Sequence, residues 1–281
     1  MKNLKYLAFA ILSIFVISCD KDENTPLPAD ELSGLLLIQE IEGPDHTIEL
    51  YSASGKLPVG HNKVFLRFRK KADNTLEKNA EVSWMPMMKM MSMNHACPYG
   101  AVTKVAGKET LFSGDIVFQM PGNDMESWEL TITYNIGGSS YTAKADINVE
   151  NTTLKRVSVF KASDSLRYIV ALIDPVTPKV GINEMTVGIY RMQSMMSFPA
   201  VENYQLTIDP RMPGMGNHGS PNNENPLYNA AVGVYKGKLS LSMTGYWKIN
   251  LVLKNDTGNI LMGEAIEGAV ESSSIYFEVD F

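Results

Sequence analysis

The chain has 281 residues, with 25 Lys and Arg against 31 Asp and Glu and a formal net charge of −6. Nucleic-acid binding depends on clustered Lys and Arg, and the sequence has no basic tract, so we expect no nucleic-acid partner. The chain is too long for one small β-sandwich and suits two domains of ordinary size.

Residues 1–18 have the pattern of a secretory signal. Lys2 and Lys5 precede an apolar run over residues 6–17, which is shorter than the roughly 20 residues of a membrane-spanning helix. Ser18 and Cys19 follow this run and complete a lipobox. The sequence therefore predicts a bacterial lipoprotein in which Cys19 carries the lipid and acyl chains anchor the protein to the membrane.

Residues 19–34 are predicted to be a lipidated tether. Residues 20–23 (Asp-Lys-Asp-Glu) resemble the charged signal that sends some lipoproteins to the outer face of the outer membrane, but a solvated acidic tether would look the same. Pro26 and Pro28, without apolar periodicity, indicate a linker. We expect an outer membrane lipoprotein, at the cell surface or on the periplasmic face.

The rest of the sequence alternates between apolar and polar residues, which is typical of half-buried β-strands. The alternation is clearest in two stretches, Trp128-Leu130-Ile132-Tyr134 and Trp247-Ile249-Leu251-Leu253. Clusters of Gly, Asn, Asp and Pro separate the strands, and no helix is expected beyond the signal. The predicted fold is all-β, with two tandem immunoglobulin-like antiparallel β-sandwiches.

Matching residues recur after about 120 positions and predict an internal duplication. The first copy would cover residues 35–150 and the second residues 155–281. The matched pairs are Asn62 and Asn183, His95 and His218, Gly114 and Gly237, Met120 and Met243, and Trp128 and Trp247.

A methionine-rich stretch lies in the first copy, with six methionines between positions 85 and 93. Thioether, thiolate and imidazole ligands suit copper, and the soft sulfur atoms favour Cu(I). The candidate ligands here are Met88, Met91, His95 and Cys97. Cys97 has no disulfide partner in the chain if Cys19 carries the lipid, and its counterpart in the second copy is Ser220.

The second copy has a shorter version with Met212, Met215 and His218 as candidate ligands. Pro213, Gly214 and Gly216 favour a loop, from which these side chains could converge on one ion. Further methionines between positions 192 and 196 could approach the same end of the domain. Copper is therefore the expected metal in both copies.

Packing is the alternative explanation, since methionine also fills irregular gaps in cores. If residues 82–93 continue as one strand, Met85, Met87, Met91 and Met93 lie on one face and Met88 and Met90 on the other. Exposed methionines could equally form a surface for a protein partner. His46 and His61 are expected to be surface histidines.

We predict no catalytic residues and no enzyme. Residues 214–219 fit the pattern G-x-G-x-x-G, but Pro221 and two asparagines follow where nucleotide binding needs a helix. The sequence shows no nucleophile elbow, no zincin motif and no serine, histidine and acid that pair as a triad.

The two methionine and histidine loops resemble those of YtkA-like domains, which are related to FixH-type proteins. The resemblance rests on Met85, Pro86, Met87, His95 and Pro98, and on a second set in the other copy, Pro210, Met212, Met215, His218 and Pro221. It implies immunoglobulin-like folds and copper handling at the cell envelope, with Met88, Met91, His95, Met212, Met215 and His218 in the matching places. The first loop is longer than the family pattern and contains Cys97.

Two hypotheses about function follow from the sequence. The first is an envelope lipoprotein that buffers Cu(I) or passes it on through the two loops. The second is an immunoglobulin-like adhesion or assembly module whose methionine loops bind an envelope protein.

Overall fold

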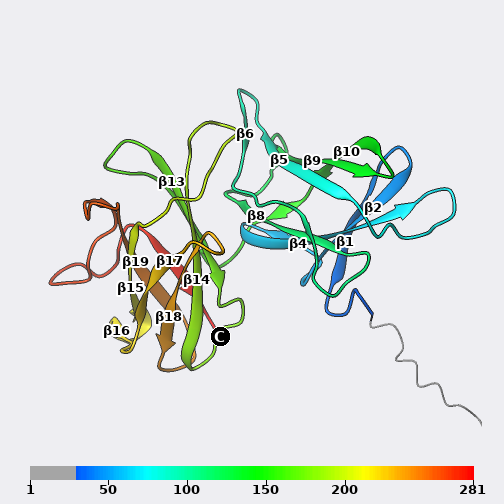
Figure 1. Ribbon diagram of the computed structural model, residues 1–281. Coiled ribbons are helices and arrows are strands. Elements are labelled where there is room, and N and C mark those ends of the chain that lie inside the picture. Colours follow the sequence, from blue (N-terminus) through cyan, green and yellow to red (C-terminus); the bar gives the residue numbers. More distant parts are fainter. Residues whose placement is uncertain (1–29) are drawn as a thin grey trace, which may run out of the picture. The chain divides into compact units, whose positions relative to one another are not determined.

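A computed structural model describes residues 30–281 (Figure 1). The predicted signal peptide, Cys19 and the charged residues 20–23 lie outside these residues. No helix in the described part is long and apolar enough to cross a membrane. Glu31–Phe281 forms one compact unit.

The first copy consists of two facing antiparallel sheets. One sheet has the strand order β1-β2-β4-β8-β7 and the other the order β10-β9-β5-β6, while β3 and β11 form a short parallel pair. The strands are β1 (Leu36–Glu42), β2 (His46–Ser52), β3 (Leu57–Pro58), β4 (Gly60–Lys70), β5 (Glu81–Lys89), β6 (Asn94–Ala96), β7 (Thr103–Lys104), β8 (Phe112–Phe118), β9 (Ser127–Ile136), β10 (Ser139–Ile147) and β11 (Val149–Glu150).

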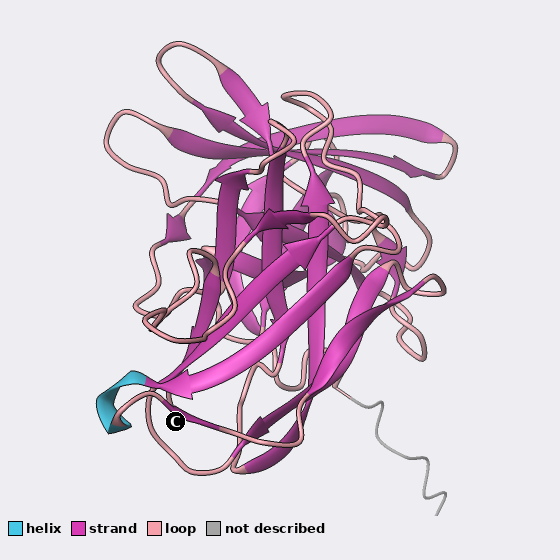
Figure 2. Ribbon diagram, turned by 90° about the vertical axis from the view of Figure 1, so that its left-hand side faces the viewer, coloured by secondary structure: helices cyan, strands magenta, loops and turns pink. Residues whose placement is uncertain are grey.

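The second copy repeats this plan with the orders β12-β13-β14-β18-β17 and β16-β15-β19-β20, and β21 also pairs with β19. Figure 2 shows its helical turn, η1 (Pro213–Met215), in cyan. The strands are β12 (Val157–Lys161), β13 (Arg167–Asp174), β14 (Gly181–Arg191), β15 (Gln205–Met212), β16 (His218–Gly219), β17 (Glu224–Asn229), β18 (Val234–Leu241), β19 (Trp247–Lys254), β20 (Ile260–Met262) and β21 (Tyr276–Val279).

The period-two pattern places one face of each central strand in a core. In β9, the side chains of Trp128, Leu130, Ile132 and Tyr134 are all fully buried, while the residues between them are half-buried. The four matching positions of β19 are fully buried in the core of the second copy. The predicted all-β, immunoglobulin-like sandwich fold is confirmed.

The two copies share local structure as well as strand order. Gly60 and Gly181 open the equivalent strands β4 and β14, with φ of 108° and 105°, a region that favours glycine. Two residues later, the Asn62 amide donates to the Gly60 carbonyl at 2.9 Å, and the Asn183 amide donates to the Gly181 carbonyl at 3.1 Å.

The tryptophans of β9 and β19 also make equivalent hydrogen bonds. The Nε1 of Trp128 donates to the Met120 carbonyl and the Nε1 of Trp247 donates to the Met243 carbonyl, each at 3.0 Å. The same four residues are matched pairs in the sequence. In both copies the bond therefore joins the tryptophan to the loop that precedes its strand.

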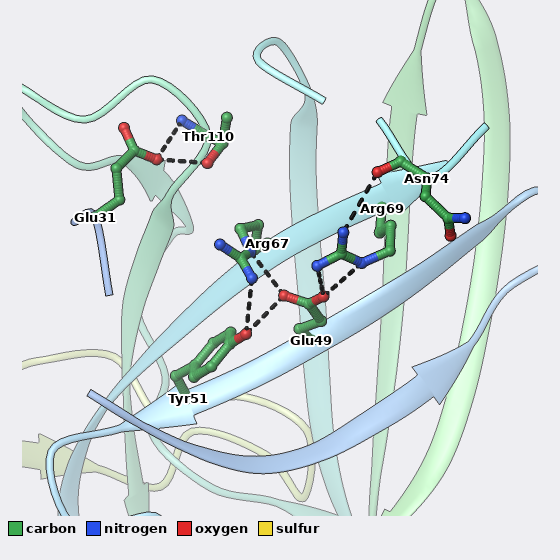
Figure 3. A network of polar contacts seen from close by, with 7 residues as sticks. All are labelled: Glu31, Glu49, Tyr51, Arg67, Arg69, Asn74 and Thr110. Carbon is green, nitrogen blue, oxygen red and sulfur yellow. Dashed lines mark hydrogen bonds and ion pairs between the residues drawn. The ribbon is translucent and has the colours of Figure 1, made fainter. Parts of the chain in front are cut away.

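Polar side chains secure the start of the first copy (Figure 3). The predicted tether ends in a turn at residues 31–34, where the Glu31 carboxylate accepts hydrogen bonds from the backbone and hydroxyl of Thr110. The compact unit, residues 31–281, therefore includes the last residues of the predicted tether.

Candidate functional site: the methionine loops

Strand β5 carries the first half of the methionine-rich stretch into the core. Its register with β9 places Met88 opposite Trp128, and Met88 is fully buried. Met85 and Met87 lie on the other face and are half-buried. The strand ends at Lys89, and the half-buried Met90 packs against the core. For Met88 and Met90 the packing explanation therefore fits the structure.

His95 lies directly opposite Met88 across the β5 and β6 pair, so both side chains project from the same face of the sheet. The His95 ring meets the Trp128 ring edge to face, with 5.8 Å between centroids. Its Nδ1 lies 2.8 Å from the Ala96 carbonyl oxygen, which can only accept. Nδ1 therefore carries the proton, and the lone pair of Nε2 remains for a ligand.

The second copy has the same register. Met212 of β15 lies opposite His218 of β16, and Met212 is buried while His218 is exposed. Between them, η1 presents Met215 to solvent with 55% of the residue's surface exposed. The structure therefore places one buried methionine and one histidine side by side in each copy, with Met91 and Met215 in the intervening loops.

Cys97 lies in the core of the first copy. Burial raises the pKa of its thiol well above the ordinary value, although backbone hydrogen bonds act in the opposite direction. A protonated, enclosed thiol is a poor metal ligand, because the thiolate is the form that binds. At the equivalent position, Ser220 is also buried and donates to the Ser240 hydroxyl at 3.3 Å.

Other methionines of this region are exposed and gather at one end of the first copy. Met91 and Met93 follow β5, with 79% and 51% of their surface exposed. The loop before β9 carries Met125 at 71%, and this loop adjoins the end of β5 because Ser127 pairs with Lys89. Met196 of the second copy is 41% exposed. It follows Met195, whose carbonyl accepts a hydrogen bond from Ala96 of β6. We call Met91, Met93, Met125 and Met196 the methionine surface.

A backbone hydrogen bond connects the two copies at this surface, where the Ala96 N–H donates to the Met195 carbonyl at 2.8 Å. Residues 192–196 therefore lie beside β6 of the first copy. They follow β14, whereas Met212 ends β15 at the other end of the second copy. The expectation that they approach Met212 and His218 is not met. The apolar cluster around Ala96 includes residues of both copies, namely Val117, Val157, Ile169, Ala171 and Phe198.

Within residues 30–281, no group of three or more His, Cys, Asp or Glu side chains is arranged to hold a metal ion. A copper site in either copy would therefore depend on thioethers and a single imidazole. Such a ligand set suits Cu(I) and gives little affinity for harder ions.

The two remaining histidines differ from each other. His61 is half-buried, with its Nε2 3.1 Å from Asp115 Oδ1. The expectation that His46 is a surface residue is wrong, because only 3% of it is exposed. Residues 71–80, which lie between β4 and β5, pass over it, and Glu77 of this segment lies 3.4 Å from its Nε2. His46 lies two residues before Ile48 and four before Leu50, so the alternation within β2 already places it on the core-facing side of the strand.

Comparison with known proteins gives little further support. No protein-family model matches the chain, so the resemblance to YtkA-like domains rests on the residues that suggested it. No curated protein matches the chain either. Among solved structures, the chain is similar to FdeC, described as a broadly conserved Escherichia coli adhesin, at 14% identity and a TM-score of 0.27. The match covers 85% of this chain and 65% of that chain, and so low a score carries no argument about function.

Proposed function

We propose that this protein is a tandem immunoglobulin-like binding module of the bacterial envelope, which docks a protein partner through the methionine surface. The observation that carries the proposal is that three exposed methionines lie in loops at one end of the first sandwich, and that an exposed methionine of the second copy, Met196, follows the residue that bonds to β6 there. Contiguous apolar patches are uncommon on monomeric proteins and mark interaction sites. Flexible, polarisable methionine side chains adapt to an apolar partner segment. The sequence supports membrane anchoring through Cys19, which would hold this module at the outer membrane.

Site-specific crosslinking in cells tests the proposal. A photoreactive amino acid in place of Met91 should give one discrete adduct on a denaturing gel. The same amino acid in place of Val176, which is 75% exposed in the second copy, should give none. Substituting Met93→Ser should reduce the Met91 adduct, whereas Met93→Leu should preserve it because leucine keeps the apolar surface. Adducts of equal yield from both positions would overturn the proposal.

Copper binding is a second candidate, and one observation favours it. Each copy places a methionine directly opposite a histidine in matching strands, Met88 with His95 and Met212 with His218. Packing alone does not require a histidine at both positions. Copper would then be held at these pairs with Met91 and Met215, so in the first copy a copper site would share Met91 with the methionine surface.

A further inference from the structure

The methionine surface is built of thioethers, which differ chemically from the leucine or valine side chains that would be equally apolar. Its four members, Met91, Met93, Met125 and Met196, each have between 41% and 79% of their surface exposed. A two-electron oxidant such as a peroxide converts an exposed thioether to a sulfoxide, which is polar. This surface is therefore open to a reaction that leucine would not undergo.

Hydrogen-bonded turns carry these methionines. Backbone hydrogen bonds close the turns over residues 90–93 and 194–197, at 3.1 and 3.3 Å between the nitrogen and oxygen of the end residues. In the loop before β9, the Met125 N–H donates to the side-chain oxygen of Asn123 at 2.9 Å. None of these bonds uses a methionine sulfur, so an oxygen added to the sulfur leaves the turns in place.

The sulfur atoms inside the two cores are shielded. Met88 and Met185 have at most 1% of their surface exposed, and an oxidant reaches a buried thioether only when the fold opens. Cys97, the cysteine within residues 30–281, is also buried, with 1% exposed. Oxidation of the folded protein should therefore fall on the exposed thioethers.

We propose that the methionine surface is a site of reversible oxidation by peroxides, and that its sulfoxides release the protein partner. The release rests on the docking function proposed above. In the reaction, the thioether sulfur attacks one oxygen of hydrogen peroxide, an S–O bond forms and the O–O bond breaks. The sulfur loses two electrons and the peroxide gains them. The departing hydroxide takes the proton of the transferred oxygen and leaves as water, and methionine sulfoxide reductases reverse the change.

Oxidation affects the docked state more than the free protein. In the free protein the sulfoxide of a side chain as exposed as Met91 stays hydrated. Against an apolar partner segment, the sulfoxide oxygen would lose water without gaining a hydrogen-bond donor, which disfavours docking. Met215 is 55% exposed at the other end of the second copy, so it should be oxidised without any effect on docking.

Peptide mass spectrometry of the purified full chain tests the site of oxidation. After treatment with hydrogen peroxide, the four methionines of the surface and Met215 should gain one oxygen about tenfold or more faster than Met88 and Met185, because burial protects a thioether. Thermal unfolding should show that the oxidised protein remains folded. Equal rates at exposed and buried positions would overturn the proposal.

Crosslinking in cells tests the release. With the photoreactive amino acid at position 91, the other three methionines of the surface remain, and peroxide should reduce the adduct about fivefold or more. Replacing Met93, Met125 and Met196 together with leucine should keep the adduct and remove its response to peroxide, because leucine is apolar and resists this oxidation. Met215→Leu is the matched control and should leave the response unchanged.

The outcomes separate the release from the docking function. No adduct before treatment would contradict docking itself, and the release with it. An adduct that persists although mass spectrometry finds the sulfoxides would overturn the release alone. The same holds for an adduct of the triple leucine variant that still falls with peroxide, because the oxidised group would then lie outside this surface.

Discussion

The carboxylate of Glu49 lies between two guanidinium groups on the face of β2 and β4 that points away from the core (Figure 3). It accepts from Arg67 Nε at 2.7 Å, from Arg69 Nε at 2.8 Å and from the Tyr51 hydroxyl at 2.6 Å. Burial alone would raise the pKa of Glu49, but these hydrogen bonds outweigh it, so the pKa lies below its ordinary value. Burial, and then the hydrogen bond to Glu49, raise the pKa of Tyr51 to about 12.

This network predicts a stability that depends on pH. Because the folded-state pKa of Glu49 is lowered, its contribution is fully present above the ordinary pKa of a glutamate and is lost as the pH falls through the folded-state value. Glu49→Gln leaves two partly buried arginines without their anion and should cost about 3 kcal/mol at neutral pH. Urea unfolding at pH 7 and at pH 3 measures this, and the difference from the parent should shrink at pH 3. Arg69→Lys is a milder control, and an equal loss for Glu49→Gln at both pH values would contradict the assignment.

At the scale of strands, period-two alternation was enough to predict β9 and β19, because a half-buried strand buries every second side chain. The pattern over residues 82–93 also placed Met88 on the opposite face from Met85 and Met87, and the structure shows these faces as far as the end of β5. The pairing of Met88 with His95 depends on the length of the intervening turn, which alternation does not encode. Alternation in β2 puts His46 on the face of Ile48 and Leu50, but its contact with Glu77 comes from a segment more than 25 residues away in sequence, which alternation does not encode.

The equivalent asparagines at the start of β4 and β14 give a prediction for these elements. Asn62 donates to the Pro58 carbonyl at 2.7 Å, and Asn183 donates to the Lys179 carbonyl at 2.8 Å, so each clamps the turn that enters its strand. Asn62→Ala and Asn183→Ala should each destabilise the protein by about 1–3 kcal/mol, because each removes a buried side chain that makes at least two hydrogen bonds to the backbone. Chemical unfolding measures the loss.

The two clamps lie in different sandwiches and share no partners, so the double variant should lose the sum of the two single effects to within about 0.5 kcal/mol. The half-buried Thr186 on β14 provides a control, since Thr186→Ala removes a side chain of similar size without a carbonyl clamp. A change near zero for either asparagine would show that water replaces the clamp.

At the scale of the whole molecule, every strand pairing of the described residues stays within positions 36–150 or 157–279. The contact between the copies joins Ala96 and Val117 of the first to Ile169, Ala171 and Phe198 of the second. This contact brings Met195 to β6, whereas Met212 and His218 lie at the other end of the second copy, in β15 and β16. Sequence alone could match the two methionine loops to each other, but the arrangement of the copies decided which methionines share a surface.

That separation predicts two independent copper sites, if copper binds. The full chain should hold one Cu(I) for each copy, measured by competition with a chromogenic chelator, and should leave Zn(II) unbound because thioethers favour the softer ion. Met212→Leu with His218→Ala should remove one equivalent. Leucine conserves the volume of the buried methionine at a cost below about 1.5 kcal/mol, and His218 is exposed, so the fold should survive. Met185→Leu makes the same exchange at a buried methionine of the same core, on β14 of the facing sheet, and should retain both equivalents. If the double variant binds as much copper as the parent, these side chains are not ligands, and the methionine loops serve packing and docking alone.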